Sequence, residues 1–187
     1  MIRRPAERLR RDERGFGLVE LLIALTIITI AIFAIYATFN AGAFAILRAS
    51  RASTASALGE KQIELYRALV WANIGLDTTG VSAADATHTS DAEWVSAASQ
   101  TVVPGCTASA AAECKPVQMP VTGPDNFQYR LDTYVRTLPG GGSGGAPGRD
   151  VKRVTVTVRR FDDQTKVLAR LVSTFDQSTG CPTASPC

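Results

Sequence analysis

A single acidic residue inside a long apolar run constrains this chain more than any other feature. The run begins at Phe16 and continues almost without polar interruption to Phe39, and Glu20 is its only charged residue. About 24 residues in an α-helix span about 36 Å, whereas the hydrocarbon core of a bilayer is about 30 Å thick. A carboxylate in such a segment costs roughly 2.5 to 3.5 kcal/mol at the bilayer centre. The sequence therefore predicts a membrane-length helix and a specific partner for Glu20.

Basic residues precede the run. They are Arg3, Arg4, Arg8, Arg10, Arg11 and Arg14. The positive-inside rule places this leader in the cytoplasm and the bulk of the chain outside. Cleavage after Gly15 would create a new amine on Phe16, four residues before Glu20 and on the same helix face. This amine is the predicted partner of Glu20, within one helix or between neighbouring helices.

Residues 14–22, Arg-Gly-Phe-Gly-Leu-Val-Glu-Leu-Leu, resemble the processing site of type IV prepilins and type II secretion pseudopilins. The resemblance implies a cytoplasmic leader at residues 1–15 that is cleaved between Gly15 and Phe16. It also implies N-methylation of Phe16 and a role for Glu20 in assembly. The implied partners are a prepilin peptidase/methyltransferase, other pilin subunits bound through the helix, an inner-membrane assembly platform, and membrane lipid before assembly.

Two features depart from the family pattern. Gly17 stands where the family usually has Thr or Ser, which should leave processing intact because cleavage depends chiefly on the Gly before the cut. The run also lacks the Pro that is common in major pilins, so the kink which Pro favours is not expected. Residues 60–69 resemble the minor pilin V and pseudopilin I branch. The expected product is a single-pass membrane protein that later joins a periplasmic or cell-surface filament.

Other readings of the N-terminus remain open. A secretory signal peptide could end at Ala41-Gly42-Ala43, but its apolar region would be roughly 7 to 15 residues long. A signal anchor explains the length of the run and leaves Glu20 unexplained. The alternative function is therefore a signal-anchored extracytoplasmic binding module that forms no filament.

The helix is expected to continue beyond the membrane, over residues 16–73, with 16–39 as the transmembrane or filament-core part. Beyond residue 48 the pattern becomes amphipathic, which predicts that this part packs on a head domain of residues 74–187. The apolar positions are Leu58, Ile63, Leu65, Leu69 and Val70.

The head is predicted to combine a long surface loop at residues 75–125 with a C-terminal antiparallel sheet at residues 126–176. Short elements are expected near residues 94–95 and 101–103. Period-two alternation predicts three strands, around residues 127–136, 153–159 and 167–175, with one apolar face. The predicted fold class is α+β and pilin-like, with a half-transmembrane N-terminal helix packed on this three-stranded sheet.

All the cysteines lie in the part predicted to be outside the cytoplasm, where disulfides persist. Cys106 and Cys114 enclose a short Ala-rich loop, and the spacing favours their pairing, although four cysteines permit other connectivities. Pairing of Cys181 with Cys187 would anchor the C-terminal end. It would resemble a reduced form of the C-terminal disulfide loop of many pilins, either for contacts or as a simple staple.

The sequence gives little support for an enzyme, a cofactor or a metal site. His88 is the only histidine, in a polar context typical of an exposed loop, and an anchored hydrolase would depend on it alone. The Gly-rich segment 140–148 precedes a strand rather than a helix, which favours a flexible loop over a dinucleotide site. The formal net charge of +3 resides mostly in the leader, so it is no firm evidence for nucleic-acid binding.

Overall fold

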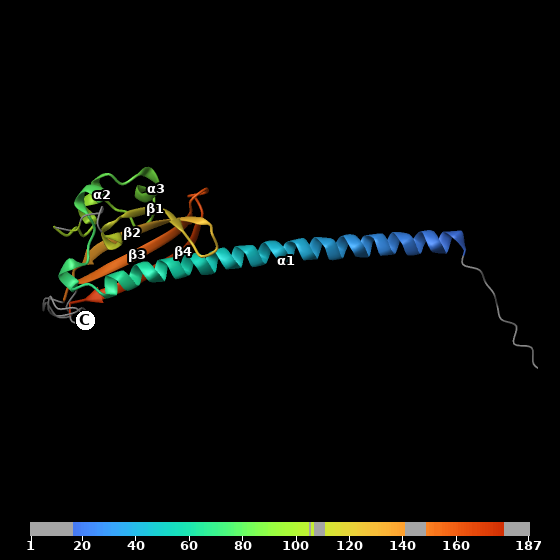
Figure 1. The fold of residues 1–187 in the computed structure, drawn as a ribbon, viewed down its shortest axis with the longest axis horizontal. Helices are drawn as coiled ribbons and strands as arrows, with labels where there is room; N and C mark the ends of the chain where they lie inside the picture. Colours follow the sequence, from blue (N-terminus) through green and yellow to red (C-terminus); the bar gives the residue numbers. More distant parts are fainter. Residues whose placement is uncertain (1–16, 105, 107–110, 141–148, 178–187) are drawn as a thin grey trace, which may run out of the picture. The chain divides into compact units, whose positions relative to one another are not determined.

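The computed structural model describes residues 17–104, 106, 111–140 and 149–177. The chain divides into two compact units, Met1–Ile46 and Leu47–Cys187, which we call the N-terminal unit and the head unit. One helix, α1 (Leu18–Arg67), contributes residues to both (Figure 1).

The N-terminal unit presents an apolar helical surface. Its side chains from Leu18 to Phe39 are exposed. The hydroxyls of its threonines bind carbonyls of the same helix: Thr26 donates to Ile23 O at 2.7 Å, and Thr29 donates to Leu25 O at 2.7 Å. Because these hydroxyls are satisfied internally, they do not need water, and the segment remains compatible with an apolar environment.

The head unit contains the C-terminal part of α1 and all the strands. Its other elements are short helices, η1 (Trp71–Asn73), α2 (Thr78–Ser82), α3 (Ala86–Thr89), η2 (Ala97–Ser99) and η3 (Ala112–Cys114), and strands β1 (Val117–Thr122), β2 (Gln128–Leu138), β3 (Val151–Arg160) and β4 (Val167–Asp176). The strands form a four-stranded antiparallel sheet in the order β1-β2-β3-β4. The predicted α+β, pilin-like fold is therefore confirmed, with one strand more than expected.

The apolar face of the sheet packs on α1, as predicted from the alternation. Leu131 and Val135 of β2 and Val156 of β3 belong to one buried core with Ile63 and Tyr66 of α1. Gly59 permits a close approach, because a Cβ at this position would lie 2.5 Å from Leu171 Cδ1 of β4. Side chains of the sheet therefore pack directly against the helix backbone at this point.

Strand β1 was not expected. It lies inside the segment predicted as a loop, and it contains Pro120, which cannot donate a hydrogen bond to a neighbouring strand. A Pro is tolerated in an edge strand, which is the position of β1 in the sheet. Its pairing with β2 is also interrupted by a register shift between Gln118 and Val121, so the strand lacks the regular alternation that sequence patterns detect.

Helix α1 ends at Arg67, earlier than the predicted Asn73. Residues 71–73 form the separate turn η1, preceded by Val70 in an extended conformation. The ammonium group of Lys152 on β3 donates to the carbonyl oxygens of Trp71 and Ile74, both at 2.8 Å, and to that of Ala72 at 3.3 Å. A cation from the sheet therefore binds the carbonyls at the end of this turn, and burial lowers the pKa of Lys152.

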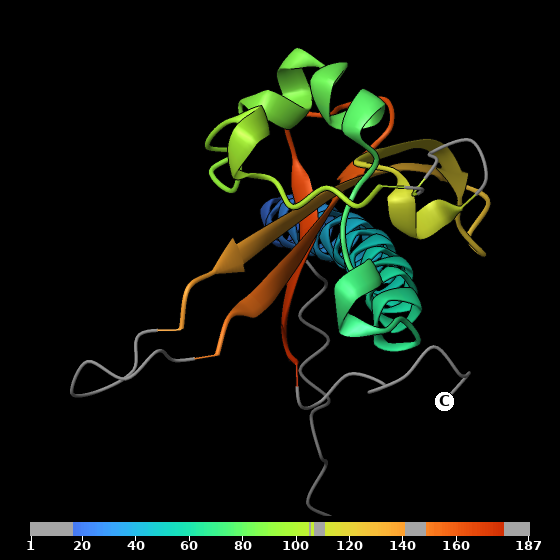
Figure 2. The same cartoon turned by 90° about the vertical axis from the view of Figure 1, so that its left-hand side faces the viewer.

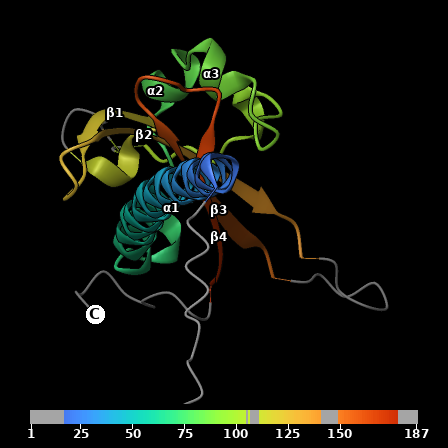
Figure 3. The ribbon, with the colours of Figure 1, turned by 90° about the vertical axis from the view of Figure 1, so that its right-hand side faces the viewer.

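The second face of the sheet is also covered. Residues 77–103, which we call the connecting segment, carry α2, α3 and η2 and lie on the side of the sheet opposite α1 (Figures 2 and 3). The segment joins the sheet through backbone bonds, since Thr101 N–H donates to Val135 O at 2.7 Å. Leu76 and Val102 form a parallel bridge, whereas residues 94–95 form no helix or strand. The predicted surface loop is therefore largely a packed layer.

Candidate functional site

Glu20 lies in the first turn of α1. The backbone N–H groups of Glu20 and Leu21 both donate to Gly17 O, at 2.9 and 3.2 Å. The first turn of a helix carries unpaired N–H groups and the positive end of the helix dipole, and both favour a nearby anion. The helix itself thus contributes part of the stabilisation that the carboxylate needs.

An uncovered apolar surface follows Glu20 along the N-terminal unit. Large side chains that are at least half exposed include Leu21, Leu22, Ile23, Leu25, Ile27, Ile28, Ile30, Ile32, Phe33, Ile35, Tyr36, Phe39, Phe44 and Ile46. The helix is long and apolar enough to cross a membrane, and its most apolar 18-residue window has a mean hydropathy of 2.8. A surface of this size requires lipid or other apolar helices to cover it.

In the head unit, the most unusual feature is a group of charged residues between the sheet and the connecting segment. We call it the ionic cluster, and its members are Asp85, Asp91, Arg130, Asp132, Arg159 and Arg170. Arg130 and Asp132 are almost completely buried. The polar face of β2, predicted to face solvent, instead lies in the interior.

Asp132 is the centre of this cluster. Its carboxylate accepts from Arg130 Nη2 at 2.8 Å and Arg130 Nε at 3.0 Å, and it lies 3.4 Å from Arg159 Nε. His88 Nδ1 lies 3.1 Å from the same carboxylate. A buried carboxylate with this many cationic and polar partners is stabilised by the partners rather than by water.

The outer carboxylates attach the connecting segment to the strands. Both Asp85 oxygens accept from Arg130, each at 2.7 Å, and Arg130 holds the pKa of Asp85 below its usual value. Asp91 accepts from Arg159 and from Arg170, the latter at 2.8 Å. Burial would raise the pKa of Asp91, but the Glu93 N–H and the Arg170 guanidinium outweigh burial and lower it.

His88 is fully buried, which corrects the prediction of an exposed loop histidine. Its ring stacks on Tyr134 with the centroids 4.3 Å apart, and Trp94 contacts its edge. Tyr134 Oη donates to His88 O at 3.0 Å. The prediction failed because the residues next to His88 are polar in sequence, whereas Tyr134 and Asp132, which enclose its ring, lie more than forty residues away. A histidine so enclosed has no access to a substrate, and it therefore lends no support to a hydrolase.

Residues 10–36 match the family model of the prokaryotic N-terminal methylation motif, which is the signature of type IV pilins and pseudopilins. The chain carries this methylation motif. No curated protein and no solved structure matches the chain.

The motif implies processing by a prepilin peptidase, and the pilin family in which it occurs is a family of structural proteins. A single N-terminal apolar helix also fits a single-pass membrane anchor. Among the residues that the structure describes, no group of His, Cys, Asp or Glu is arranged to hold a metal ion.

The predicted site residues are distributed over both units. Glu20 lies at the start of α1. Gly15 and Phe16, the predicted processing site, lie outside the described residues, as do Cys181 and Cys187. The ionic cluster was missed altogether, because the alternation of Arg130 and Asp132 with apolar residues is also the pattern of a strand with one solvent-facing side.

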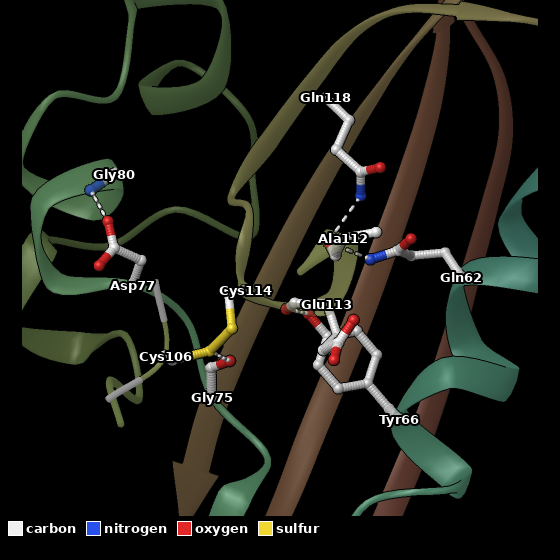
Figure 4. Close-up of a disulfide and its surroundings, with 10 residues drawn as sticks. All are labelled: Gln62, Tyr66, Gly75, Asp77, Gly80, Cys106, Ala112, Glu113, Cys114 and Gln118. Carbon is white, nitrogen blue, oxygen red and sulfur yellow. Dashed lines mark hydrogen bonds between the residues drawn. A yellow bond between two sulfur atoms is a disulfide. The ribbon is translucent and has the colours of Figure 1, made fainter. Parts of the chain in front are cut away.

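Cys106 and Cys114 form a disulfide, in agreement with the predicted local pairing (Figure 4). The bond lies beside contacts between η3 and α1. Gln62 Nε2 of α1 donates to Ala112 O at 3.1 Å, and Tyr66 Oη donates to Glu113 O. Burial raises the pKa of Tyr66 well above its usual value, so its hydroxyl remains a donor. The disulfide thus helps to hold the turn that receives these bonds from the helix.

Removal of the Cys106–Cys114 disulfide tests its contribution to stability. The closed loop, with a sequence separation of 8, should contribute about 2.5 kcal/mol to the free energy of unfolding on loop entropy alone. Cys106→Ser/Cys114→Ser should lower the midpoint of urea unfolding accordingly.

Peptide mapping tests the connectivity of the cysteines. Under non-reducing conditions, trypsin should release residues 68–130 and 171–187 as separate peptides, because each holds one local cysteine pair. Covalent joining of these two peptides would show that the cysteines pair differently.

Proposed function

We propose that this protein is a structural subunit, a minor pilin or pseudopilin, of a type IV pilus or a type II secretion-like filament. The observation that carries the proposal is the uncovered apolar helix of the N-terminal unit, with Glu20 in its first turn and the methylation motif across residues 10–36. The chain inserts with its N-terminus in the cytoplasm and is cut between Gly15 and Phe16. It is then N-methylated on Phe16.

The apolar helix serves in two environments. Before assembly, lipid covers the side chains from Leu18 to Ile46, and afterwards the helices of neighbouring subunits cover them. Both environments are apolar, so the transfer exposes little apolar surface to water. The head is then presented in the periplasm or on the cell surface, where the disulfide persists.

The mature N-terminus tests this function directly. Mass spectrometry of the protein from the native host should find an N-terminal peptide that begins with Phe16 and carries one additional methyl group. Gly15→Leu should retain the leader, because the peptidase then lacks the residue that precedes the cut. An intact leader on the unsubstituted chain would refute the filament function and favour a signal-anchored binding module.

A further inference from the structure

At one end of the head unit, two exposed aromatic side chains lie beside two arginines. Phe127, in the β1–β2 turn, is 46% exposed, and Phe161, at the end of β3, is 37% exposed. A hydrogen bond joins the end of β3 to the start of β2, since Phe161 N–H donates to Gln128 O at 3.2 Å. With Arg51 of α1 and Arg160, these phenylalanines line a concavity of about 280 Å³. We call these four residues the basic-aromatic patch.

Arg51 supplies the positive charge of the patch. Its guanidinium carbon lies 4.3 Å from the centroid of the Phe127 ring. Among the described residues Arg51 forms no ion pair, and its Nε atom is buried without a hydrogen-bond partner. An arginine whose guanidinium lies over an aromatic ring, and which no carboxylate pairs with, can bind a phosphate through its terminal nitrogens.

The acidic residues near the patch are already engaged. Asp162 pairs with Arg160, and Asp163 pairs with Lys166 at 2.9 Å. Asp125 accepts from the Tyr129 hydroxyl, and burial together with this bond raises the pKa of Tyr129 to about 12. None of these carboxylates pairs with Arg51, so its guanidinium remains available to bind an anion.

Chain length keeps the patch close to the membrane. Arg51 follows Ile46, the last residue of the N-terminal unit, by five positions. This distance is about 7.5 Å in a helix and at most about 17 Å in an extended chain, whatever the arrangement of the two units. The part of α1 that carries exposed apolar side chains, from Leu18 to Leu47, would itself span about 45 Å, the thickness of a whole bilayer with its headgroups. Arg51 is therefore tethered at the depth of lipid phosphates.

From these observations we infer that the basic-aromatic patch binds phospholipid headgroups on the outer surface of the membrane. Arg51 contacts the phosphate, and Phe127 and Phe161 enter the interfacial layer, where aromatic rings are favoured. The inference rests on the membrane anchorage proposed above. The docked patch would hold the head against the bilayer until the subunit is extracted into a filament, and the tether makes even a weak contact effective.

The test uses the full mature chain in nanodiscs that hold a single copy. Compared with the unsubstituted chain, which contains Trp71 and Trp94, Phe161→Trp should add fluorescence that is strongly quenched by a nitroxide attached to the headgroup of phosphatidylglycerol. Val172→Trp is the matched control, because Val172 is 54% exposed and lies on β4 beside the far end of α1. Adding Arg51→Gln should lower the docked-to-undocked ratio about fivefold, the effect of one arginine at an anionic surface. Raising the salt concentration without any substitution at Arg51 should act in the same direction.

Each outcome separates the docking from the anchorage. Equal quenching of Phe161→Trp and Val172→Trp in discs that contain the chain overturns the docking. If the quenching of Phe161→Trp changes only when two chains share a disc, the patch binds a second copy of the chain. This outcome also overturns the docking. Failure of the chain to co-elute with the discs would instead count against the membrane anchorage and the proposed function.

Discussion

Asp132→Ala is expected to destabilise the head by about 3–5 kcal/mol, the cost of breaking a buried ion pair from one side. The substitution leaves Arg130 buried with one carboxylate fewer, and it removes the partner of His88 Nδ1. Arg159 also loses its contact at 3.4 Å. Because these groups cannot reach water without opening the connecting segment, the segment and the sheet should separate together.

Urea unfolding of the full chain in detergent measures this effect, with Trp94 fluorescence as the probe because the indole contacts His88. Asp162→Ala is the matched control. It also removes the carboxylate partner of an arginine, but the Asp162 side chain is 65% exposed, so the midpoint should hardly change. Similar losses for both variants would mean that the cluster contributes no more than a surface pair.

Asp132→Asn separates charge from hydrogen bonding at the same position. The amide retains one acceptor oxygen for Arg130, so part of the network survives, while the negative charge that balances Arg130 and Arg159 is lost. The expected loss of stability is intermediate between those of Asp162→Ala and Asp132→Ala. An Asn variant as stable as the unsubstituted chain would show that shape and hydrogen bonding, rather than charge, hold the cluster together.

The apolar half of the architecture follows from local patterns. Alternation in β2 places Leu131 and Val135 on one face, and the amphipathic pattern beyond residue 48 places Ile63 on the apolar face of a helix. Both patterns are direct records of burial against an apolar partner, so they predicted the helix-on-sheet packing. The position of Val167 was predicted wrongly. A register shift near Arg159 places Val167 opposite Arg159, so Val167 does not lie on the apolar face that alternation alone predicts for it.

The polar half could not be predicted in the same way. Arg130 and Asp132 alternate with apolar residues, which is the pattern of a strand with one solvent-facing side. Their burial depends on Asp85 and His88, which are more than forty residues away in sequence. No local period records such a pairing, because a charged residue looks the same in sequence whether water or an opposite charge stabilises it. The connecting segment therefore resembled a loop, although it covers the second face of the sheet.

Glu20→Ala is expected to abolish incorporation into the filament while leaving membrane insertion and cleavage intact. In the apolar core of a filament, the Phe16 amine that cleavage creates would lose its carboxylate partner. An unpaired charge in such an environment costs roughly 2.5 to 3.5 kcal/mol, which corresponds to about a hundredfold in the assembly equilibrium. The same substitution removes a carboxylate from the lipid-exposed helix, so the membrane-embedded state becomes more favourable. Both effects act in the same direction and keep the subunit in the bilayer.

The measurement compares the subunit content of sheared filaments with that of membranes, in cells that also produce the unsubstituted chain. Glu60→Ala provides the control, since it removes a carboxylate from the same helix but in the head unit, where the side chain is exposed; its incorporation should be normal. Glu20→Asp should recover part of the incorporation, because a shorter carboxylate still carries the charge. Normal incorporation of Glu20→Ala would refute the pairing, whereas loss of cleavage would place the role of Glu20 in processing. Pairing with the Phe16 amine assigns Glu20 to the step between cleavage and incorporation, because this amine exists only after Gly15 has been removed.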